Sequence, residues 1–300
     1  MTLVVIAGAT ATGKSDLAVS LAKKIGGEVV NADSMQLYRG MDIGTAKLSL
    51  MEREGIAHHL LDLVDVSTDV NVAWYQEQAR TIIDKLLANG IPAIVVGGTG
   101  FYIKAILDDL NFPDTYPAVR EKLTLEAEKI GGDALHKRLG ILDPAAAAAI
   151  PRENVRRVIR ALEVIEITGK PFTANLPREN STKYPDALQF GLTMERELLD
   201  VRVDKRVDLM FEKGLVAEVE QLIEQGLLEG KTARAALGYA QVISMLAGDI
   251  SLEQAISDTK LATRQYIRRQ ETWFRRDQRI SWLDSDSNRL ETIEKAILNA

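Results

Sequence analysis

A pattern typical of phosphate-binding loops stands near the beginning of the chain, directly after the short apolar run Leu3–Ala7. It fits G-x-x-x-x-G-K-S/T and consists of Gly8, Ala9, Thr10, Ala11, Thr12, Gly13, Lys14 and Ser15. The glycines allow a tight turn, and the free N–H groups of the following helix bind phosphate oxygens. Lys14 would place its charge on the terminal phosphate, and the Ser15 hydroxyl would ligate a bridging Mg²⁺. The pattern therefore predicts a polyphosphate site.

A second group that could do chemistry follows the next apolar run, Glu28–Ala32. Asp33 and Ser34 come directly after it, so they would lie at the carboxyl end of a strand beside the phosphate loop. Open α/β sheets carry their chemistry at this edge. A turn or helix N-cap is the alternative role for Asp33.

Alternating strands and helices are predicted to position these groups. The expected elements are a helix over Asp16–Ile25, a polar loop with a short helix over Asp42–Ala57, a strand over His58–Val64, a helix over Val72–Ala88 and a buried strand over Ile91–Val96.

Two further features accompany these elements. His58 and His59 would point to opposite faces of their strand, one buried and one exposed, which makes them a poor metal chelate. The run Gly97–Gly100 follows a strand, and its glycines would allow a ligand to approach the backbone, with Thr99 offering a hydroxyl. Such glycines also occur in ordinary strand-to-helix turns.

The alternation then stops. Residues Tyr116–Asp186 read as helices followed by a stretch with Pro171, Pro177 and Pro185, and strand character returns at Leu188–Met194. We therefore expect a catalytic core of residues 1–115 and 187–300, and a helical insertion domain of residues 116–186.

Arginines are concentrated in two helical segments. The first has Arg152, Arg156, Arg157 and Arg160 against one acid, Glu153, and Arg156 and Arg160 would share a face without acidic partners. This favours an anion-binding stripe as much as a solvated face.

The second segment, Ala262–Arg279, has six arginines, with Tyr266, Trp273 and Phe274 interleaved. A basic, aromatic helix favours contact with nucleic-acid phosphates. Its aromatic residues could equally be core anchors. A last short strand is expected over Ile280–Asp284.

Composition narrows the class of protein. The 300 residues are 46% hydrophobic and 27% charged, which is usual for a soluble protein, and no apolar stretch approaches membrane-spanning length. We expect a cytoplasmic protein. The absence of cysteine excludes thiolate metal sites, disulfides and a cysteine nucleophile. A net charge of −6 argues mildly against bulk nucleic-acid binding, so any such role depends on local charge.

Over nearly its whole length the chain resembles the tRNA dimethylallyltransferases, also called tRNA isopentenyltransferases. The resemblance rests on GATATGKS (8–15), NADSMQLYRGMDIGTAK (31–47), HHLLD (58–62), GGTGFY (97–102), NVRRVIRALEV (154–164), ALGY (236–239) and ATRQYIRRQETWF (262–274). The departures are Ala9 in place of the usual proline, Phe101 in place of a frequent leucine, and the run NVAWY (71–75). The resemblance implies an α/β fold with a P-loop NTPase-like parallel sheet flanked by helices and an inserted all-helical domain.

The resemblance implies transfer of the dimethylallyl group of dimethylallyl diphosphate to the exocyclic amine of the adenosine 3′ of the anticodon. Thr10, Lys14, a magnesium ion on Ser15 and, by resemblance, Arg206 would stabilise the departing diphosphate. Asp33 would accept the proton of the amine. Gln36 could pair with an adenine edge.

Residues expected to contact tRNA come from the same motifs. They are Asp33, Ser34, Met35, Gln36, Thr99, Arg156, Arg157, Arg160, Gly238, Tyr239, Arg264, Gln265, Arg268, Arg269, Gln270 and Trp273. The expected partners are dimethylallyl diphosphate and the anticodon stem-loop of tRNA, with no membrane, and the enzyme is expected to be a monomer.

Three other functions compete with this one. A small-metabolite kinase would use the loop with ATP, but it would leave both arginine clusters idle. An isopentenyltransferase for free adenine nucleotides would need neither the insertion domain nor the basic helix. A non-catalytic RNA-binding protein would leave Asp33 and the loop unexplained.

Overall fold

The computed structural model describes residues 2–175, 181–285 and 288–300. Contacts divide the chain into two compact units, Met1–Leu107 with Tyr184–Ala300, and Asp108–Lys183. These borders compare with the expected 116–186 for the insertion, and the expected Pro177 lies outside the described residues.

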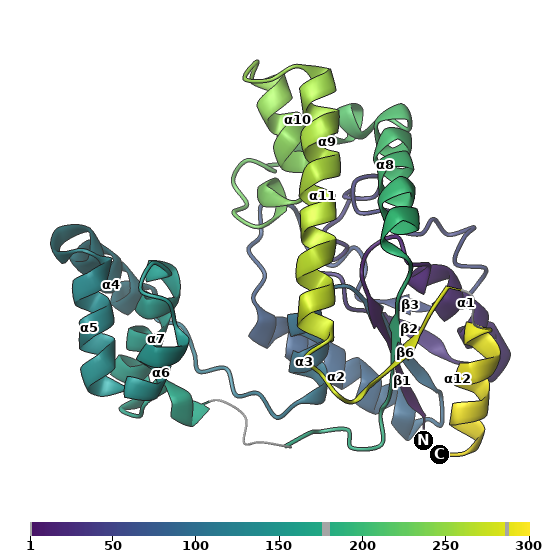
Figure 1. Cartoon of the computed structure of the whole chain (residues 1–300), viewed down its shortest axis with the longest axis horizontal. Coiled ribbons are helices and arrows are strands. Elements are labelled where there is room, and N and C mark those ends of the chain that lie inside the picture. The colour runs from purple at the N-terminus through teal and green to yellow at the C-terminus, as the bar shows by residue number, and fades with distance from the viewer. Residues whose placement is uncertain (1, 176–180, 286–287) are drawn as a thin grey trace. The chain divides into compact units, whose positions relative to one another are not determined.

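A parallel sheet is the centre of the first unit, with helices around it (Figure 1). Its six strands have the order β3-β2-β4-β1-β5-β6. The strands are β1 (Leu3–Gly8), β2 (Glu28–Asn31), β3 (His58–His59), β4 (Ala93–Gly97), β5 (Leu188–Leu192) and β6 (Ile280–Leu283). Strand β1, which leads into the phosphate loop, pairs with β4 and β5, so the loop begins at the middle of the sheet.

Eight α-helices and one 3₁₀ helix of the described residues accompany this sheet. They are α1 (Lys14–Ile25), α2 (Val72–Ala88), α3 (Gly100–Leu107), α8 (Arg196–Glu212), α9 (Leu215–Glu224), η2 (Ala233–Ala235), α10 (Tyr239–Leu246), α11 (Leu252–Phe274) and α12 (Arg289–Leu298).

Both faces of the sheet are covered because neighbouring strand residues point to opposite sides. Val4 and Ile6 of β1 face the cluster that includes residues of α1 and α12. Leu3, Val5 and Ala7 face the cluster that includes residues of α2 and α3. Burial on both sides explains why β1 is apolar throughout.

A further core cluster lies among α9, α10 and the segment after β2. It combines Tyr38 and Met41 with Leu215, Leu222 and Tyr239, all of them almost completely buried. This cluster packs the chain that follows Asp33 against the C-terminal helices.

The second unit is helical. Its elements are α4 (Pro117–Ile130), α5 (Gly132–Leu142), α6 (Pro144–Ala149), α7 (Val155–Thr168) and η1 (Phe172–Asn175). Leu123, Leu135, Leu139, Val158 and Leu162 form the middle of its own apolar core.

Several details of the structure differ from the expectations. Strand β3 is only His58–His59, because Leu60 and Asp62 adopt positive φ angles of 61° and 56° and turn the chain out of the sheet. Both histidines are half-buried, rather than one buried and one exposed. The expected short helix within 42–57 is absent, since this described segment consists of turns, and helix α12 was not expected.

Among the described residues no helix combines the length and the apolar character that a membrane crossing requires.

Candidate active site

The phosphate loop has the predicted form of strand, loop and helix. Gly8 has φ 141° and lies so close to β5 that a β-carbon there would stand 2.7 Å from the Leu192 carbonyl oxygen. Gly13 has φ 89° and precedes α1, whose first residue is Lys14. The Thr12 hydroxyl donates to the Ala9 carbonyl at 2.8 Å and closes the turn. The N–H groups of the first turn of α1 are therefore free for an anion.

Lys14 is held inside this loop. Its Nζ donates to the Ala9 carbonyl at 2.5 Å. Burial, together with the nearby charge of Arg206, lowers the pKa of Lys14 to about 7, although the charge of Asp33 acts in the opposite direction. A phosphate would supply the missing counter-charge, so its binding should restore the proton affinity of Lys14.

Asp33 lies directly after β2, as expected. Its Oδ1 accepts from the N–H of Met35 at 2.9 Å, and its own N–H donates to Oδ1 of Asn31 at 3.0 Å. Burial raises the pKa of Asp33, although the hydrogen bond from Met35 and the charges of Lys14 and Arg206 oppose the change. Asp33 is therefore both a turn residue, as in the alternative interpretation, and a carboxylate suited to accept a proton.

Helix α8 brings Arg206 to the same place. Its Nη1 donates to the Thr10 hydroxyl at 3.2 Å. Burial lowers the pKa of Arg206, and the charge of Asp33 opposes this shift. Thr10, Lys14, Asp33 and Arg206 thus form one cluster in which a carboxylate lies among two cations and the loop.

Gln270 of α11 supports this cluster through a hydrogen bond to the phosphate loop. It is only 5% exposed. Its Oε1 accepts from the N–H of Thr10 at 3.0 Å, and its Nε2 donates to the Gly98 carbonyl at 2.9 Å. A tRNA contact by this side chain was expected; the structure instead uses it to join the phosphate loop to the loop after β4, because both of its polar atoms are occupied inside the protein.

Thr99 and Ser34 join two strand ends beside Asp33. The Thr99 hydroxyl accepts from the N–H of Ser34 at 3.1 Å, and the N–H of Thr99 donates to the Ala32 carbonyl at 3.2 Å. Gln36 follows, and its Nε2 donates to the Thr45 carbonyl at 3.1 Å. The Asp33–Gln36 segment and Thr99 therefore meet at the carboxyl edge of the sheet, the edge that was predicted for Asp33 and Ser34.

Tyr239 differs from its expectation as a tRNA contact. Its side chain is completely buried, and its hydroxyl donates to Oε1 of Glu218 at 2.5 Å. Gly238 precedes it with φ 85°, and its N–H donates to Oε1 of Gln241 at 2.9 Å. The Tyr239 side chain thus belongs to the core.

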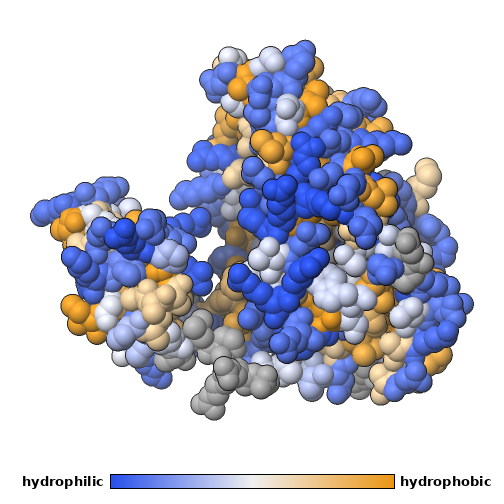
Figure 2. Space-filling view, in the orientation of Figure 1, coloured by the Kyte–Doolittle hydropathy of each residue, from blue (hydrophilic) through white to orange (hydrophobic). Residues whose placement is uncertain are grey.

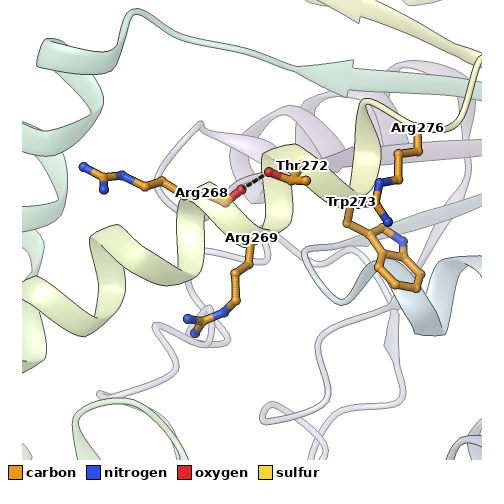
Figure 3. Close-up of a pocket in the computed structure, with 5 residues that line it drawn as sticks. All are labelled: Arg268, Arg269, Thr272, Trp273 and Arg276. Carbon is orange, nitrogen blue, oxygen red and sulfur yellow. Dashed lines mark hydrogen bonds between the residues drawn. The ribbon is translucent and has the colours of Figure 1, made fainter. Parts of the chain in front are cut away.

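The outer side of α11 carries the exposed cations. Arg268, Arg269, Thr272, Trp273 and Arg276 surround an open hollow of about 310 Å³. In Figure 3 Arg268 and Arg269 point in different directions, while Trp273 and Arg276 lie together. Neither Arg268 nor Arg269 forms an ion pair with a described residue, and the surface over α11 is predominantly hydrophilic in Figure 2.

Other residues expected on this surface are placed differently. Arg264 pairs with both carboxylate oxygens of Asp204 at 2.7 and 2.8 Å, and both side chains are partly exposed. This intramolecular pair neutralises part of the Arg264 charge. Gln265 is exposed and lines a separate shallow groove. Trp273 is 42% exposed and contacts Phe101 edge-on, so it is both an anchor and a surface residue.

The arginines of α7 also include one that is paired within the protein and two that are exposed. Arg160 pairs with the buried Glu163 at 2.9 Å and donates to the Pro113 carbonyl at 2.7 Å. The expectation that it lacks an acidic partner was wrong, because Glu163 lies one turn further along the same helix. Arg156 and Arg157 are exposed.

Arg289 is a residue that the sequence did not single out. It lies at the start of α12, and its guanidinium donates to the carbonyls of Thr12 at 2.9 Å and Thr193 at 2.7 Å. It supports the phosphate loop from the end of the chain. No local pattern marks it, since its partners are far away in the sequence.

The fold and the cluster define a class: a phosphate-loop α/β protein with a buried carboxylate, Asp33, close to the cations of the loop. Comparison with known proteins narrows this class. The model of the family "IPP transferase" matches residues 36–277. The tRNA dimethylallyltransferase of Streptomyces griseus is 54% identical over 281 residues, covering 94% of this chain and 89% of that protein. That of Corynebacterium diphtheriae is 49% identical over 287 residues, covering 96% and 95%.

Solved structures agree with this relationship. The tRNA isopentenylpyrophosphate transferase of Bacillus halodurans is 39% identical, with a TM-score of 0.73 and coverage of 99% and 96%. A eukaryotic dimethylallyltransferase captured acting on tRNA is 30% identical, with a TM-score of 0.85 and coverage of 100% and 79%. The chain belongs to the IPP transferase family, and its phosphate-loop fold and its prenyltransferase class are those expected from its motifs.

Proposed function

We propose that this chain transfers the dimethylallyl group from dimethylallyl diphosphate to the exocyclic amine of the adenosine immediately 3′ of the anticodon in tRNA. The observation that carries the proposal is the cluster of Asp33, Lys14, Arg206 and Thr10 at the phosphate loop. The cluster supports the proposal because the reaction needs a proton acceptor and donors for a diphosphate, and the cluster combines a carboxylate with two cations and a hydroxyl.

The phosphate loop would take the diphosphate end of the donor. During transfer the bond between the prenyl carbon and the bridging oxygen breaks, and negative charge collects on diphosphate. Lys14, the Thr10 hydroxyl and Arg206 are hydrogen-bond donors already held around that position, so they stabilise the charge as it develops.

A magnesium ion fits this site. The Ser15 hydroxyl lies in the first turn of α1 and makes no hydrogen bond with any described residue, so it is free to act as a ligand. When bound, the ion would neutralise charge on the diphosphate oxygens.

Asp33 would act on the acceptor. The adenine amine attacks the prenyl carbon, a carbon–nitrogen bond forms, and one amine proton passes to the Asp33 carboxylate. The amine is a poor nucleophile because its lone pair is delocalised into the ring, so removal of this proton during attack lowers the barrier. The raised pKa of Asp33 makes it a better proton acceptor than an exposed aspartate.

The RNA would be held by exposed cations outside this cluster. Arg268 and Arg269 of α11 supply phosphate contacts, and Trp273 offers an aromatic surface for an unstacked base. Arg156 and Arg157 of the second unit add exposed charge for the anticodon stem-loop. The target base must leave its stack to reach Asp33. We further propose a cytoplasmic monomer.

The test is a reaction of the purified protein with Mg²⁺, dimethylallyl diphosphate and unmodified tRNA that carries adenosine 3′ of the anticodon. Digestion and mass spectrometry should show a prenylated nucleoside at that position. Parallel reactions contain free AMP as the acceptor, or ATP in place of the prenyl donor. Prenylation of AMP alone, or consumption of ATP without prenyl transfer, would contradict the proposal.

A further inference from the structure

One carboxylate holds the loop that follows the Asp33 segment. Glu218 of α9 accepts three backbone N–H groups: its Oε2 accepts from Asp42 at 3.2 Å and Ile43 at 2.8 Å, and its Oε1 accepts from Gly44 at 3.3 Å. A charged acceptor shared by three successive N–H groups fixes the path of the backbone more firmly than neutral bonds would.

The buried Tyr239 holds the Glu218 carboxylate in place. Its hydroxyl donates to Glu218, and burial together with the Glu218 charge raises the pKa of Tyr239 far above its ordinary value, so the donor keeps its proton. Its ring packs directly on Gly44, where any β-carbon would collide with the ring. The ALGY and MDIGTAK motifs therefore meet in space, and each limits what the other can be.

The fixed loop leads to Gln36. The next residue after Gly44 is Thr45, whose carbonyl accepts from Nε2 of Gln36 at 3.1 Å and whose hydroxyl donates to the Met41 carbonyl at 2.6 Å. Lys47 completes the loop by donating to the Tyr38 carbonyl at 2.9 Å. The Oε1 atom of Gln36 accepts no hydrogen bond from a described residue, so this oxygen and one amide hydrogen remain available.

The Thr45 carbonyl thus decides which way the Gln36 amide points. An amide has a donor end and an acceptor end, and a flip exchanges them. Adenine presents its amine donor beside a ring-nitrogen acceptor, N1 on one edge and N7 on the other. For a base held in one orientation, a fixed amide matches this order, whereas a flipped amide does not. A carbonyl at a fixed position favours one of the two orientations, because it can accept only from the amide nitrogen.

We propose that Glu218, with Tyr239, is a positioning residue that sets the Gln36 amide for recognition of the acceptor adenine. The proposal rests on the function proposed above. Glu218 acts through the backbone of Gly44 and Thr45, so its role is to select the base and not to bind the donor or the RNA backbone.

The test pairs enzyme variants with altered acceptor bases. Single-turnover rates are measured with tRNA carrying adenosine, 7-deazaadenosine or 1-deazaadenosine at the acceptor position. Each deaza base lacks one ring nitrogen that Gln36 could contact. The enzymes are the unaltered protein, Glu218→Gln, Tyr239→Phe, Gln36→Ala and, as a matched control on α9, Glu220→Gln, whose side chain is exposed.

The unaltered protein and Glu220→Gln should lose about tenfold in rate with one of the two deaza bases, the loss expected for one hydrogen bond. Glu218→Gln and Gln36→Ala should both react about tenfold more slowly with adenosine, and their affinity for tRNA should be unchanged. Replacing adenosine by that deaza base should lower the rate of either variant only slightly further. Tyr239→Phe, which removes one hydroxyl only, should show a smaller change in the same direction.

Three results would overturn the proposal. If Glu218→Gln and Tyr239→Phe both lose as much rate with the deaza base as the unaltered protein does, Glu218 and Tyr239 have only a structural role. No penalty for either base in the unaltered protein would mean that Gln36 does not read a ring nitrogen. No prenylated nucleoside from the unaltered protein with ordinary tRNA would remove the proposed function, and this role with it.

Discussion

The phosphate-loop cluster and the outer side of α11 use the same kinds of side chain for opposite purposes. At the loop, Lys14 and Arg206 are held by hydrogen bonds, and burial lowers the pKa of both. On α11, Arg268 and Arg269 are exposed and make no ion pair with a described residue. Burial therefore decides the role of a charge, since desolvated charges act on a reaction and solvated ones attract a polyanion.

The same contrast exists within α11 itself. Gln270 faces inward and holds Thr10, whereas Arg269, its neighbour in sequence, is exposed. One helix thus supports the catalytic loop and offers a basic surface. Four predictions separate the two roles, beginning with the largest effect.

Asp33→Asn should reduce the rate of prenyl transfer by about a thousandfold, because the amide cannot accept the amine proton. Affinity for tRNA should change by less than about twofold. Single-turnover kinetics and a filter-binding titration measure the two quantities. Asp186→Asn, at an exposed position, is the control and should be fully active. Full activity of Asp33→Asn would remove Asp33 as the base.

Gln270→Ala should weaken inorganic diphosphate binding by about 2 kcal/mol, since the hydrogen bonds that join Gln270 to the N–H of Thr10 and to the Gly98 carbonyl are both lost. Calorimetry measures this without any tRNA. Gln265→Ala, on the exposed side of the same helix, should bind diphosphate normally. Equal diphosphate affinity in the two variants would contradict the inward role of Gln270.

Diphosphate binding should become weaker as the pH rises above about 7. The pKa of Lys14 in the protein without diphosphate is about 7, and only protonated Lys14 attracts diphosphate. Binding should take up almost one proton at pH 8 and almost none at pH 6. Calorimetry in buffers of different ionisation enthalpy measures this uptake.

Lys14→Arg is the control for this pH dependence. Its side chain keeps its charge at both pH values, so it reports the titration of diphosphate alone. The same proton uptake in Lys14→Arg and in the unaltered protein would show that Lys14 does not titrate on binding.

The double variant Arg268→Ala, Arg269→Ala should weaken tRNA binding several-fold and reduce the slope of log K against log salt by between about one and two. Diphosphate affinity should not change. Arg264→Ala is the control, because Arg264 is paired with Asp204. Its loss should lower the melting temperature and leave the slope of log K against log salt almost unchanged. An unchanged slope in the double variant would argue against phosphate contacts on α11.

Local patterns in the sequence predicted much of this arrangement. The phosphate loop, the helix that begins at Lys14 and the strands β1, β2, β4 and β5 follow from short apolar runs and glycine positions. The placement of Asp33 near the loop followed from parallel topology. Strand β3 was overestimated because the positive φ angles of Leu60 and Asp62 have no glycine to announce them.

The supporting contacts could not be predicted, because they join distant parts of the chain. Gln270 reaches Thr10 over 260 positions, and Arg289 reaches Thr12 over 277. No periodicity or spacing encodes such a pair. Glu163 was within reach of prediction, since it lies three residues after Arg160, but its burial depends on the packing of α4 against α7.

The position of β1 in the sheet has a consequence for synthesis on the ribosome. β1 pairs with β4 on one side and with β5 on the other, and β5 is encoded only after the whole second unit. At about 5–20 residues per second, the β5 side of the nascent β1 stays without its partner for roughly 5–20 seconds after β4 has emerged. The strand that carries the phosphate loop is thus an open edge during translation, and chaperones that cover such edges should engage this chain in that interval.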